Sequence, residues 1–349
     1  MNKHFVAYVG TYTRDHGVGI HIYDLLNNQL SEREVISVHN PSDLNISRSK
    51  RVLYSIADEG VVAYRILKDG SLDKLNELWT GGMRGCYLTS DKSGRYLFIA
   101  GHYDGTVTVV SLNEDGSLGM VTDTIYHKGL NIGIAKRGAN PQVCSLKITP
   151  DERFLCAVDS GLDRVYIYEI NYITGKLEEA NIIRGHLDSA PRKIGFSVDY
   201  KYAYVLCELK RCVDVYAISN QQEVPKFEVI QTISTVEEDD GDYCSASDMK
   251  ICPQGDMMIC SNAGANSVAV FCIHKDSGLL EEICNLKISG SYPKTLSFLP
   301  DCEHFIVLNQ ESNEIVTFSI KKGANYFLME GKPLEIQTPN CIQFYDLDA

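Results

Sequence analysis

Short segments in which apolar and polar residues alternate recur along the whole chain. Seven copies begin at a glycine or a polar residue, at intervals of 41 to 58 residues. They cover 19–23, 60–64, 105–109, 163–168, 212–216, 266–271 and 313–318. A period of two is the pattern of a strand that is buried on one face. The chain therefore predicts a repetitive all-β fold built from half-buried strands.

Other strands and turns flank each copy. An apolar strand precedes it, and another strand follows after a turn such as Asp69-Gly-Ser-Leu72, Asp115-Gly-Ser-Leu118 or Thr174-Gly-Lys-Leu177. These turns supply the positive-φ positions that hairpins need. A further strand begins near a proline, at Pro41, Pro141, Pro191 and Pro293. Four short antiparallel strands per repeat are typical of a β-propeller blade.

The two ends of the chain complete the repeat pattern. Residues 5–9 have the pattern of a second strand without a first, and 339–345 that of a first strand with nothing after it. Their pairing would close the ring and remove an exposed sheet edge. We expect one domain over residues 1–349, a seven-bladed β-propeller closed by N- and C-terminal strands in one blade. The single tryptophan, Trp79, argues against WD40 repeats.

Charge and hydropathy narrow the partners and the location. The formal net charge of −13 repels phosphate backbones, so we expect no nucleic-acid partner. No apolar run approaches the roughly 18 to 20 residues of a membrane span, and residues 1–10 lack the features of a signal peptide. The sequence thus predicts a cytoplasmic protein without a membrane partner. A monomer is expected, since a closed propeller has no free edge to pair.

The sequence lacks the cysteine spacings and the short motifs that would indicate a metal site or a known catalytic mechanism. The 12 cysteines include no CxxC pair, and several lie in apolar runs such as 154–158. Buried free thiols in a reducing cytosol are favoured over a disulfide or zinc framework. The sequence has no P-loop, Gly-x-Ser-x-Gly or HExxH motif, so neither a cofactor nor a metal is expected. The acidic run 237–242 is interpreted as a solvated loop, with a metal site as the alternative.

The propeller topology itself predicts a site. First strands start on the face where second strands end, so these ends surround one mouth of the central channel, a default place for a ligand. Starts of first strands contribute Arg84, Gln142, Cys144, Arg192, Lys193, Asp248 and Lys294. Ends of second strands contribute Tyr12, Asp58, His102, Tyr103, Asp159, Glu208, Asn262, Asn309 and Gln310.

Two charged residues of one blade stand out at this mouth. Arg192 and Glu208 lie on adjacent strands, so Arg192 can hold a substrate anion while Glu208 acts as a base or an orienting acceptor. The alternative is a structural ion pair. The Gly-rich connection 127–140 contains Arg137 and is either a mobile loop that grips an anion or an ordinary surface excursion. His102, His127 and His186 are scattered and are interpreted as polar loop residues.

Several segments, in order along the chain, resemble the seven-bladed propeller lactonases, a family that includes propeller-type 6-phosphogluconolactonases and fungal carboxy-cis,cis-muconate cyclases. They are Tyr8-Val-Gly-Thr-Tyr12, Thr149-Pro-Asp151, Ala190-Pro-Arg192, Tyr202-Ala-Tyr-Val-Leu-Cys-Glu208, Ser261-Asn262, Asn266-Ser-Val-Ala-Val-Phe271, Leu308-Asn-Gln310 and Pro339-Asn-Cys-Ile342. The likeness covers nearly all the chain.

The resemblance implies a site with Arg192 in a Pro-Arg pair, Glu208 at the end of the next strand and Arg137 in the long loop. Three family positions differ. The Pro-His-x-His segment is Pro141-Gln-Val-Cys144 here, the histidine after Pro-Arg is Lys193, and the arginine after Ser-Asn is Ala263. Loss of a proton-carrying histidine would lower a rate by roughly 10² to 10⁴.

The resemblance implies a lactonase that opens a small anionic sugar lactone, such as the 6-phosphogluconolactone of the pentose phosphate pathway, without a cofactor. Glu208 and Arg192 are the candidate catalytic residues. The candidate substrate-binding residues are Arg137, Lys193, Cys144, Gln142, His102, Asp248 and Lys294. Lys193 and Lys294 restore positive charge, and Cys144 is interpreted as a packed thiol rather than a nucleophile. The alternatives are a catalytically degenerate propeller that binds an anion, glycan or protein at this face, and an isomerase or cyclase of the muconate type.

Overall fold

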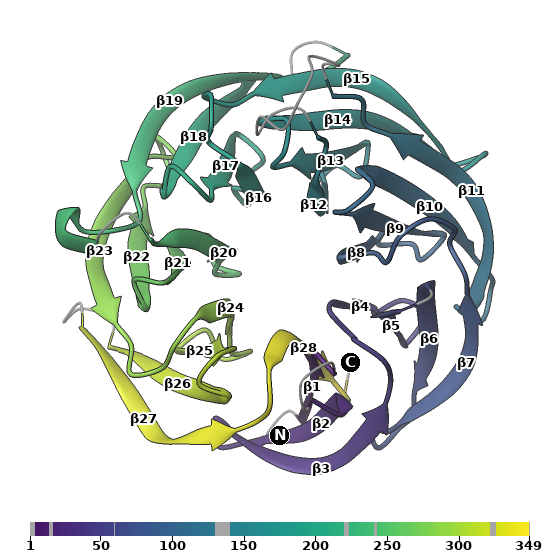
Figure 1. The fold of residues 1–349 in the computed structure, drawn as a ribbon, viewed down its shortest axis with the longest axis horizontal. Helices are drawn as coiled ribbons and strands as arrows, with labels where there is room; N and C mark the ends of the chain where they lie inside the picture. The colour runs from purple at the N-terminus through teal and green to yellow at the C-terminus, as the bar shows by residue number, and fades with distance from the viewer. Residues whose placement is uncertain are drawn as a thin grey trace.

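The structure is a closed ring of seven antiparallel four-stranded sheets (Figure 1), which confirms the predicted propeller. This computed structural model describes residues 4–13, 17–58, 60–129, 140–219, 223–240, 243–321 and 326–348. In each blade the first strand lies nearest the axis and the fourth lies at the outside. Within the described residues, no helix is long and apolar enough to cross a membrane.

The first four blades follow one another along the chain. Blade 1 consists of β4 (Leu44–Ser47), β5 (Val52–Ala57), β6 (Gly60–Ile66) and β7 (Leu72–Leu78). Blade 2 consists of β8 (Tyr87–Ser90), β9 (Tyr96–Gly101), β10 (Thr106–Leu112) and β11 (Leu118–Tyr126). Blade 3 consists of β12 (Val143–Ile148), β13 (Phe154–Asp159), β14 (Arg164–Asn171) and β15 (Lys176–Arg184). Blade 4 consists of β16 (Pro191–Phe196), β17 (Tyr202–Cys207), β18 (Cys212–Ser219) and β19 (Lys226–Ser234).

The remaining blades complete the ring. Blade 5 consists of β20 (Ser245–Ile251), β21 (Met257–Ala263), β22 (Ser267–Ile273) and β23 (Leu280–Lys287). Blade 6 consists of β24 (Pro293–Phe298), β25 (His304–Asn309), β26 (Glu314–Lys321) and β27 (Tyr326–Glu335). Blade 7 consists of β28 (Pro339–Asp346), β1 (Phe5–Thr11), β2 (Gly19–Leu26) and β3 (Gln29–Ser37). A short 3-10 helix, η1 (Glu238–Asp240), lies between blades 4 and 5.

Blade 7 joins the two ends of the chain. Strand β28 pairs antiparallel with β1, and this register places Tyr8 opposite Gln343. The predicted closure by terminal strands is thereby confirmed. In the sheet order β28-β1-β2-β3, strand β1 has hydrogen-bonded neighbours on both sides, so the N-terminal strand is not left as a sheet edge.

The seven repeated segments form the third strand of each blade, but they are more deeply buried than predicted. In β6, for example, five consecutive residues from Gly60 to Tyr64 are buried. Neighbouring blades cover both faces of an inner strand, so its polar positions must be small or hydrogen-bonded. The outermost strands, such as β19, alternate between exposed and half-buried residues instead.

The predicted Gly-containing turns also connect neighbouring blades. Gly70, Gly116 and Gly175 have φ values of 85°, 85° and 69°, as the turn type demands. The hydroxyl of Tyr8 donates to the carbonyl of Gly70 in the next blade at 2.8 Å, and that of Tyr54 donates to Gly116 at 2.7 Å. Each such bond satisfies a buried hydroxyl and holds two blades together.

The hydrophobic core is divided among the spaces between blades. One cluster combines Phe154 and Cys156 of blade 3 with Phe196, Val205 and Tyr216 of blade 4. All twelve cysteines are free thiols, as the sequence predicted. Each blade therefore depends on its two neighbours for burial of its apolar side chains.

Candidate functional site

Five blades begin their innermost strand with a β-bulge. At each bulge one residue of the first strand has no partner on the second strand; these residues are Cys144, Arg192, Ser247, Lys294 and Asn340. Bulges near functional sites re-aim a side chain. All five residues line a cavity at one mouth of the channel. We call them the bulge ring.

Four of the five bulge-ring side chains donate a hydrogen bond to a backbone carbonyl of the next blade. The thiol of Cys144 donates to the carbonyl of Arg192 at 3.4 Å, and Nε of Arg192 donates to the carbonyl of Ser247 at 2.7 Å. The hydroxyl of Ser247 donates to the carbonyl of Lys294 at 2.9 Å, and the amide of Asn340 donates to the carbonyl of Ser42. The orientation of these four side chains thus depends on the packing of two blades.

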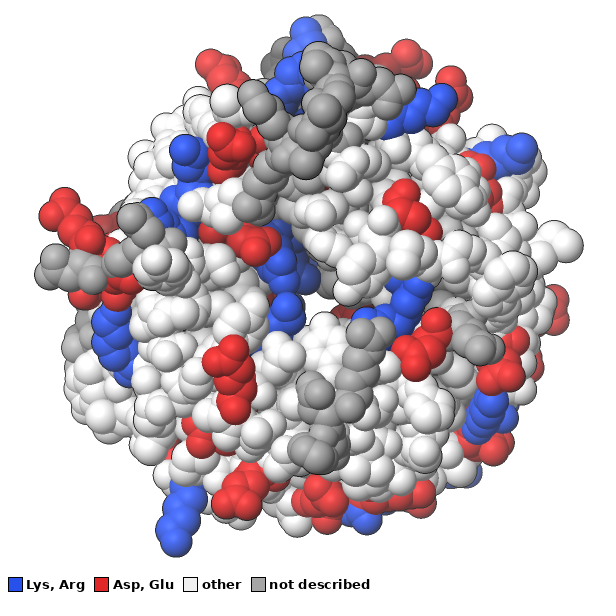
Figure 2. Space-filling model, viewed as in Figure 1, with Lys and Arg blue, Asp and Glu red and all other residues white. Residues whose placement is uncertain are grey.

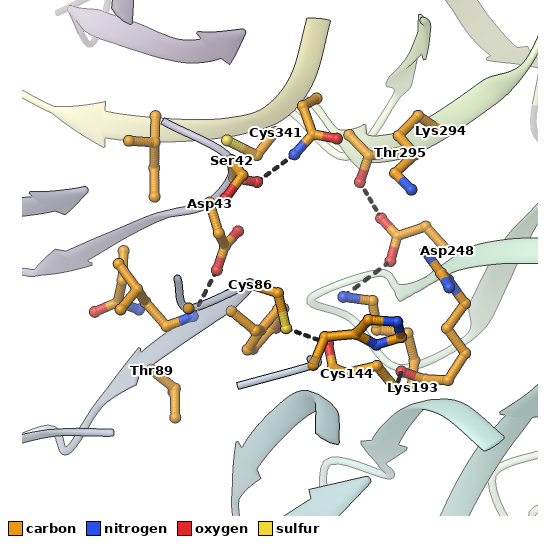
Figure 3. Close-up of a pocket in the computed structure, with 18 of the residues that line it drawn as sticks. Ser42, Asp43, Cys86, Thr89, Cys144, Lys193, Asp248, Lys294, Thr295 and Cys341 are labelled. Atoms are coloured by element: carbon orange, nitrogen blue, oxygen red, sulfur yellow. Dashed lines mark hydrogen bonds and ion pairs between the residues drawn. The ribbon is translucent and has the colours of Figure 1, made fainter. Parts of the chain in front are cut away.

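The cavity, about 450 Å³ in volume, is strongly cationic. Figure 3 shows Asp43, Cys144, Lys193, Asp248 and Lys294 around it. The cationic residues that line it are Arg84, Lys147, Arg192, Lys193, Lys250 and Lys294, and the carboxylates are Asp43 and Asp248. Lys and Arg side chains border the central opening (Figure 2), although the chain as a whole has a net charge of −13. A focused positive field in a cleft attracts anions.

Arg192 is held from two sides. Its Nη1 donates to Oε2 of Glu208 at 2.8 Å, with the side chains 22% and 24% exposed. Burial disfavours the charge on Arg192, but the carboxylate of Glu208, together with Cys144 and Tyr292, more than offsets burial and raises the pKa of Arg192. Glu208 is not among the residues that line the cavity. The pair therefore places the guanidinium toward the cavity and keeps the carboxylate behind it.

Two basic groups beside Arg192 have lowered pKa values. Burial and the charge of Arg192 lower the pKa of Lys294 to about 7, from an ordinary 10.5. The same two causes lower the pKa of His102 below its ordinary 6.5. At neutral pH the imidazole of His102 is therefore mostly uncharged and able to accept a proton, while Lys294 is only partly charged.

The two carboxylates of the cavity differ in their surroundings. Asp248 is buried, but its ion pairs with Lys250 at 3.2 Å and Lys193 at 3.8 Å lower its pKa to about 2. Asp43 accepts a hydrogen bond from the backbone N–H of Leu88 at 2.7 Å, yet burial raises its pKa to about 6. Asp248 is thus a fixed negative charge, and Asp43 can be protonated near neutrality.

Cys144 has the environment of a packed thiol. Its single S–H has three carbonyl acceptors within reach, because the sulfur also lies 3.4 Å from the carbonyl of Val158 and 3.5 Å from that of Pro191. Burial raises the pKa of Cys144 to about 11. A nucleophilic cysteine needs a thiolate, so these contacts favour a structural role in the bulge ring.

The predicted site residues divide into three groups. The cavity is lined by His102, Cys144, Arg192, Lys193, Asp248 and Lys294, together with Tyr12, Arg84 and Tyr103. Predicted residues that do not line it are Asp58, Gln142, Asp159, Glu208, Asn262, Asn309 and Gln310. Gln142 precedes the bulge, and its backbone N–H donates to Asp159 at 2.8 Å. Arg137 lies outside the described residues, as does most of its loop.

His127 is not the polar loop residue that we expected. Its Nδ1 lies 2.7 Å from Oδ2 of Asp159, and its Nε2 lies 2.9 Å from the hydroxyl of Tyr168. The side chains of His127 and Asp159 are 0% exposed. This buried network ties the fourth strand of blade 2 to blade 3, away from the cavity.

The sequence predictions missed several residues of the cavity. Asp43, Lys147, Lys250 and Thr295 line it. Lys147 and Lys250 each lie near the end of an innermost strand, in 143–148 and 245–251. The sequence did contain a signal for Lys147 and Lys250. Each is a lysine within a strand that the repeat places next to the channel axis. Within the described part of the chain, no cluster of three or more His, Cys, Asp or Glu could hold a metal ion.

Known proteins match nearly the whole chain. The family model "Lactonase, 7-bladed beta-propeller" matches residues 6–344. The 6-phosphogluconolactonase of Bacillus subtilis is 28% identical over 97% of this chain and 98% of its own length. A periplasmic gluconolactonase of Pseudomonas aeruginosa has a similar fold, with a TM-score of 0.90 and 24% identity over 99% of both chains. A protein from Lactobacillus plantarum has a TM-score of 0.90 and 25% identity, over 99% of this chain and all of its own. Because one of these relatives is periplasmic, the cytoplasmic location stays a prediction.

Proposed function

Because the chain belongs to the lactonase family of seven-bladed β-propellers, we propose that it hydrolyses a phosphorylated sugar lactone such as 6-phosphogluconolactone. The observation that carries the proposal is the cationic cavity at the bulge ring, within an otherwise acidic protein. A phosphorylated lactone brings its own negative charge and develops a second one when water attacks its carbonyl. Relatives named 6-phosphogluconolactonase support the same substrate class.

Arg192 is proposed to bind the carbonyl oxygen of the lactone. Its Nε and Nη1 are engaged by Ser247 and Glu208, and no hydrogen bond of Nη2 is found within the described residues. A preorganised donor at this position stabilises the oxyanion more in the transition state than in the ground state. Lys193 and Lys294 are proposed to bind the phosphate group. Glu208 then acts as a positioning residue, because it fixes the guanidinium without lining the cavity.

His102 is proposed to activate the water. Its ring lines the cavity, is close enough to Arg192 to be influenced by its charge, and is neutral at pH 7. One ring nitrogen takes a proton as the water oxygen bonds to the lactone carbonyl carbon. The tetrahedral intermediate then collapses, the bond to the ring oxygen breaks, and the imidazolium returns its proton to that oxygen. The product is the open hydroxy acid, and no other reactant is consumed.

The test is a pH-stat assay of the purified protein on freshly prepared 6-phosphogluconolactone, alongside uncharged gluconolactone. We expect a rate well above spontaneous hydrolysis, with a higher kcat/KM for the phosphorylated substrate. His102→Gln is expected to lower kcat by roughly 10² to 10⁴, the usual contribution of a general base. Absence of any rate above the spontaneous one on both lactones would refute the proposal.

A further inference from the structure

A second cavity opens toward the opposite mouth of the channel. Its volume is about 510 Å³, and its outer part is lined by turns that follow the innermost strands, around Pro150 and Ser197. These turns lie at the far end of the strands from the bulge ring. The two cavities share the lining residues Tyr87, Thr89, Lys147, Lys193 and Lys250. The shared residues place the cavities end to end along the channel.

Three of the shared residues are lysines, one from each of three consecutive blades: Lys147 on β12, Lys193 on β16 and Lys250 on β20. We call them the channel lysines. Asp248 is the carboxylate closest to them, 3.2 Å from Lys250 and 3.8 Å from Lys193. No ion pair of Lys147 is found in the part of the chain that the structure describes. Burial and the charges of Lys250 and Lys193 lower the pKa of Lys147.

The charge around the channel lysines is therefore unbalanced. Lys92, at the rim of the second cavity, is already paired with Glu152 at 3.2 Å. Two carboxylates act on these three ammonium groups: Asp248 through its ion pairs, and Asp43 of the first cavity through the charges of Lys193 and Lys250. One positive charge is left over. Like charges held together in this way are unfavourable unless an anion joins them. Apolar side chains, including Phe196, Met249 and Ile251, line much of the remaining wall.

From this geometry we infer that the second cavity binds a phosphate group through the channel lysines. A phosphate carries about −1.5 to −2 charges near neutral pH and has several acceptor oxygens. It can therefore contact all three ammonium groups at once, each as a charge-assisted hydrogen bond. This site goes beyond lactone hydrolysis: it shares Lys193 with the proposed substrate site, but it involves neither Arg192 nor His102.

The test separates this site from the first one. In an Arg192→Met, Lys294→Met background, which weakens the bulge-ring site, calorimetry should still show one site for pyrophosphate. Addition of Lys147→Met should raise its Kd at least tenfold, whereas the matched control Lys74→Met, on the outer strand β7, should change it less than twofold. A background protein that binds no pyrophosphate, or an unchanged Kd after Lys147→Met, would overturn the inference.

Two further measurements keep the test decisive. Glucose 6-phosphate is titrated beside pyrophosphate. Tighter binding of glucose 6-phosphate would identify a phosphate ester as the ligand class, and tighter binding of pyrophosphate would identify an inorganic phosphate. Binding of neither contradicts the inference. If the background protein fails to fold, crystals of the wild-type protein are soaked in tungstate. A tungsten peak in contact with Nζ of Lys147 is expected, and its absence at saturating tungstate would refute the site.

Discussion

Replacement of Arg192 by lysine tests the proposed oxyanion contact. Arg192 uses Nε for Ser247 at 2.7 Å and Nη1 for Glu208 at 2.8 Å, which leaves Nη2 for the substrate. A lysine keeps the charge but has a single nitrogen, which cannot reach all three partners. The variant should therefore keep the field of the cavity and lose the hydrogen bond to the carbonyl oxygen.

The expected loss follows from the strength of such a bond. A hydrogen bond to a charged group contributes about 1.5 to 3 kcal/mol, and about 1.4 kcal/mol is tenfold, so Arg192→Lys should lower kcat/KM by roughly 10- to 150-fold. The loss should be similar for 6-phosphogluconolactone and for uncharged gluconolactone, because both present the same carbonyl. Initial rates by pH-stat measure it.

The control is Arg65→Lys, the same chemical change at an exposed outer pair with Asp115. It should leave kcat/KM within about twofold of wild type, since surface ion pairs contribute little, typically about 0 to 1 kcal/mol. A loss in Arg192→Lys confined to the phosphorylated lactone would show that Arg192 binds the phosphate instead. A loss below threefold on both lactones would refute the role of Arg192 altogether.

Four other changes have defined outcomes. Glu208→Gln keeps an oxygen acceptor for Arg192 and should lower kcat/KM less than about tenfold; a loss of about 10² or more would make Glu208 the base instead. Lys294 is protonated below its pKa of about 7 and loses its charge above it. The KM for the phosphorylated lactone should therefore rise as pH increases from 6.5 to 8.5. A rise of equal size in Lys294→Met would contradict this role. Cys144→Ser keeps a donor in the bulge ring and should retain at least half of kcat, whereas abolished turnover would indicate a nucleophile. His127→Ala leaves the carboxylate of Asp159 buried without its imidazole and should lower the free energy of unfolding by about 3 to 5 kcal/mol in urea denaturation. A change below about 0.5 kcal/mol would contradict the network.

The fold could be predicted because the repeat appears in every part of the chain. Hydrophobic periodicity and turn residues such as Gly70 recur along the chain, and each blade is the same four-stranded antiparallel sheet. The burial of the third strands was underestimated, because periodicity within one strand says nothing about the blade that covers its other face. The hydroxyl bond from Tyr8 to Gly70 was missed for the same reason.

The site could be predicted only in outline. Topology correctly brought Arg192, Lys193, Lys294 and His102 to one mouth. The bulges were not predictable, since a bulge is a difference in register between two strands and leaves no local sequence pattern. This explains why Gln142 was predicted in the cavity along with Cys144, although of the two only Cys144 lines it.

The most direct test of the central claim is a crystal structure with 6-phosphogluconate, the product of the proposed reaction. We predict that its carboxylate contacts Arg192 within about 3 Å, beside the ring of His102, with its phosphate against Lys193 and Lys294. A product bound on the outer strands, or one whose carboxylate lies away from Arg192, would contradict the account.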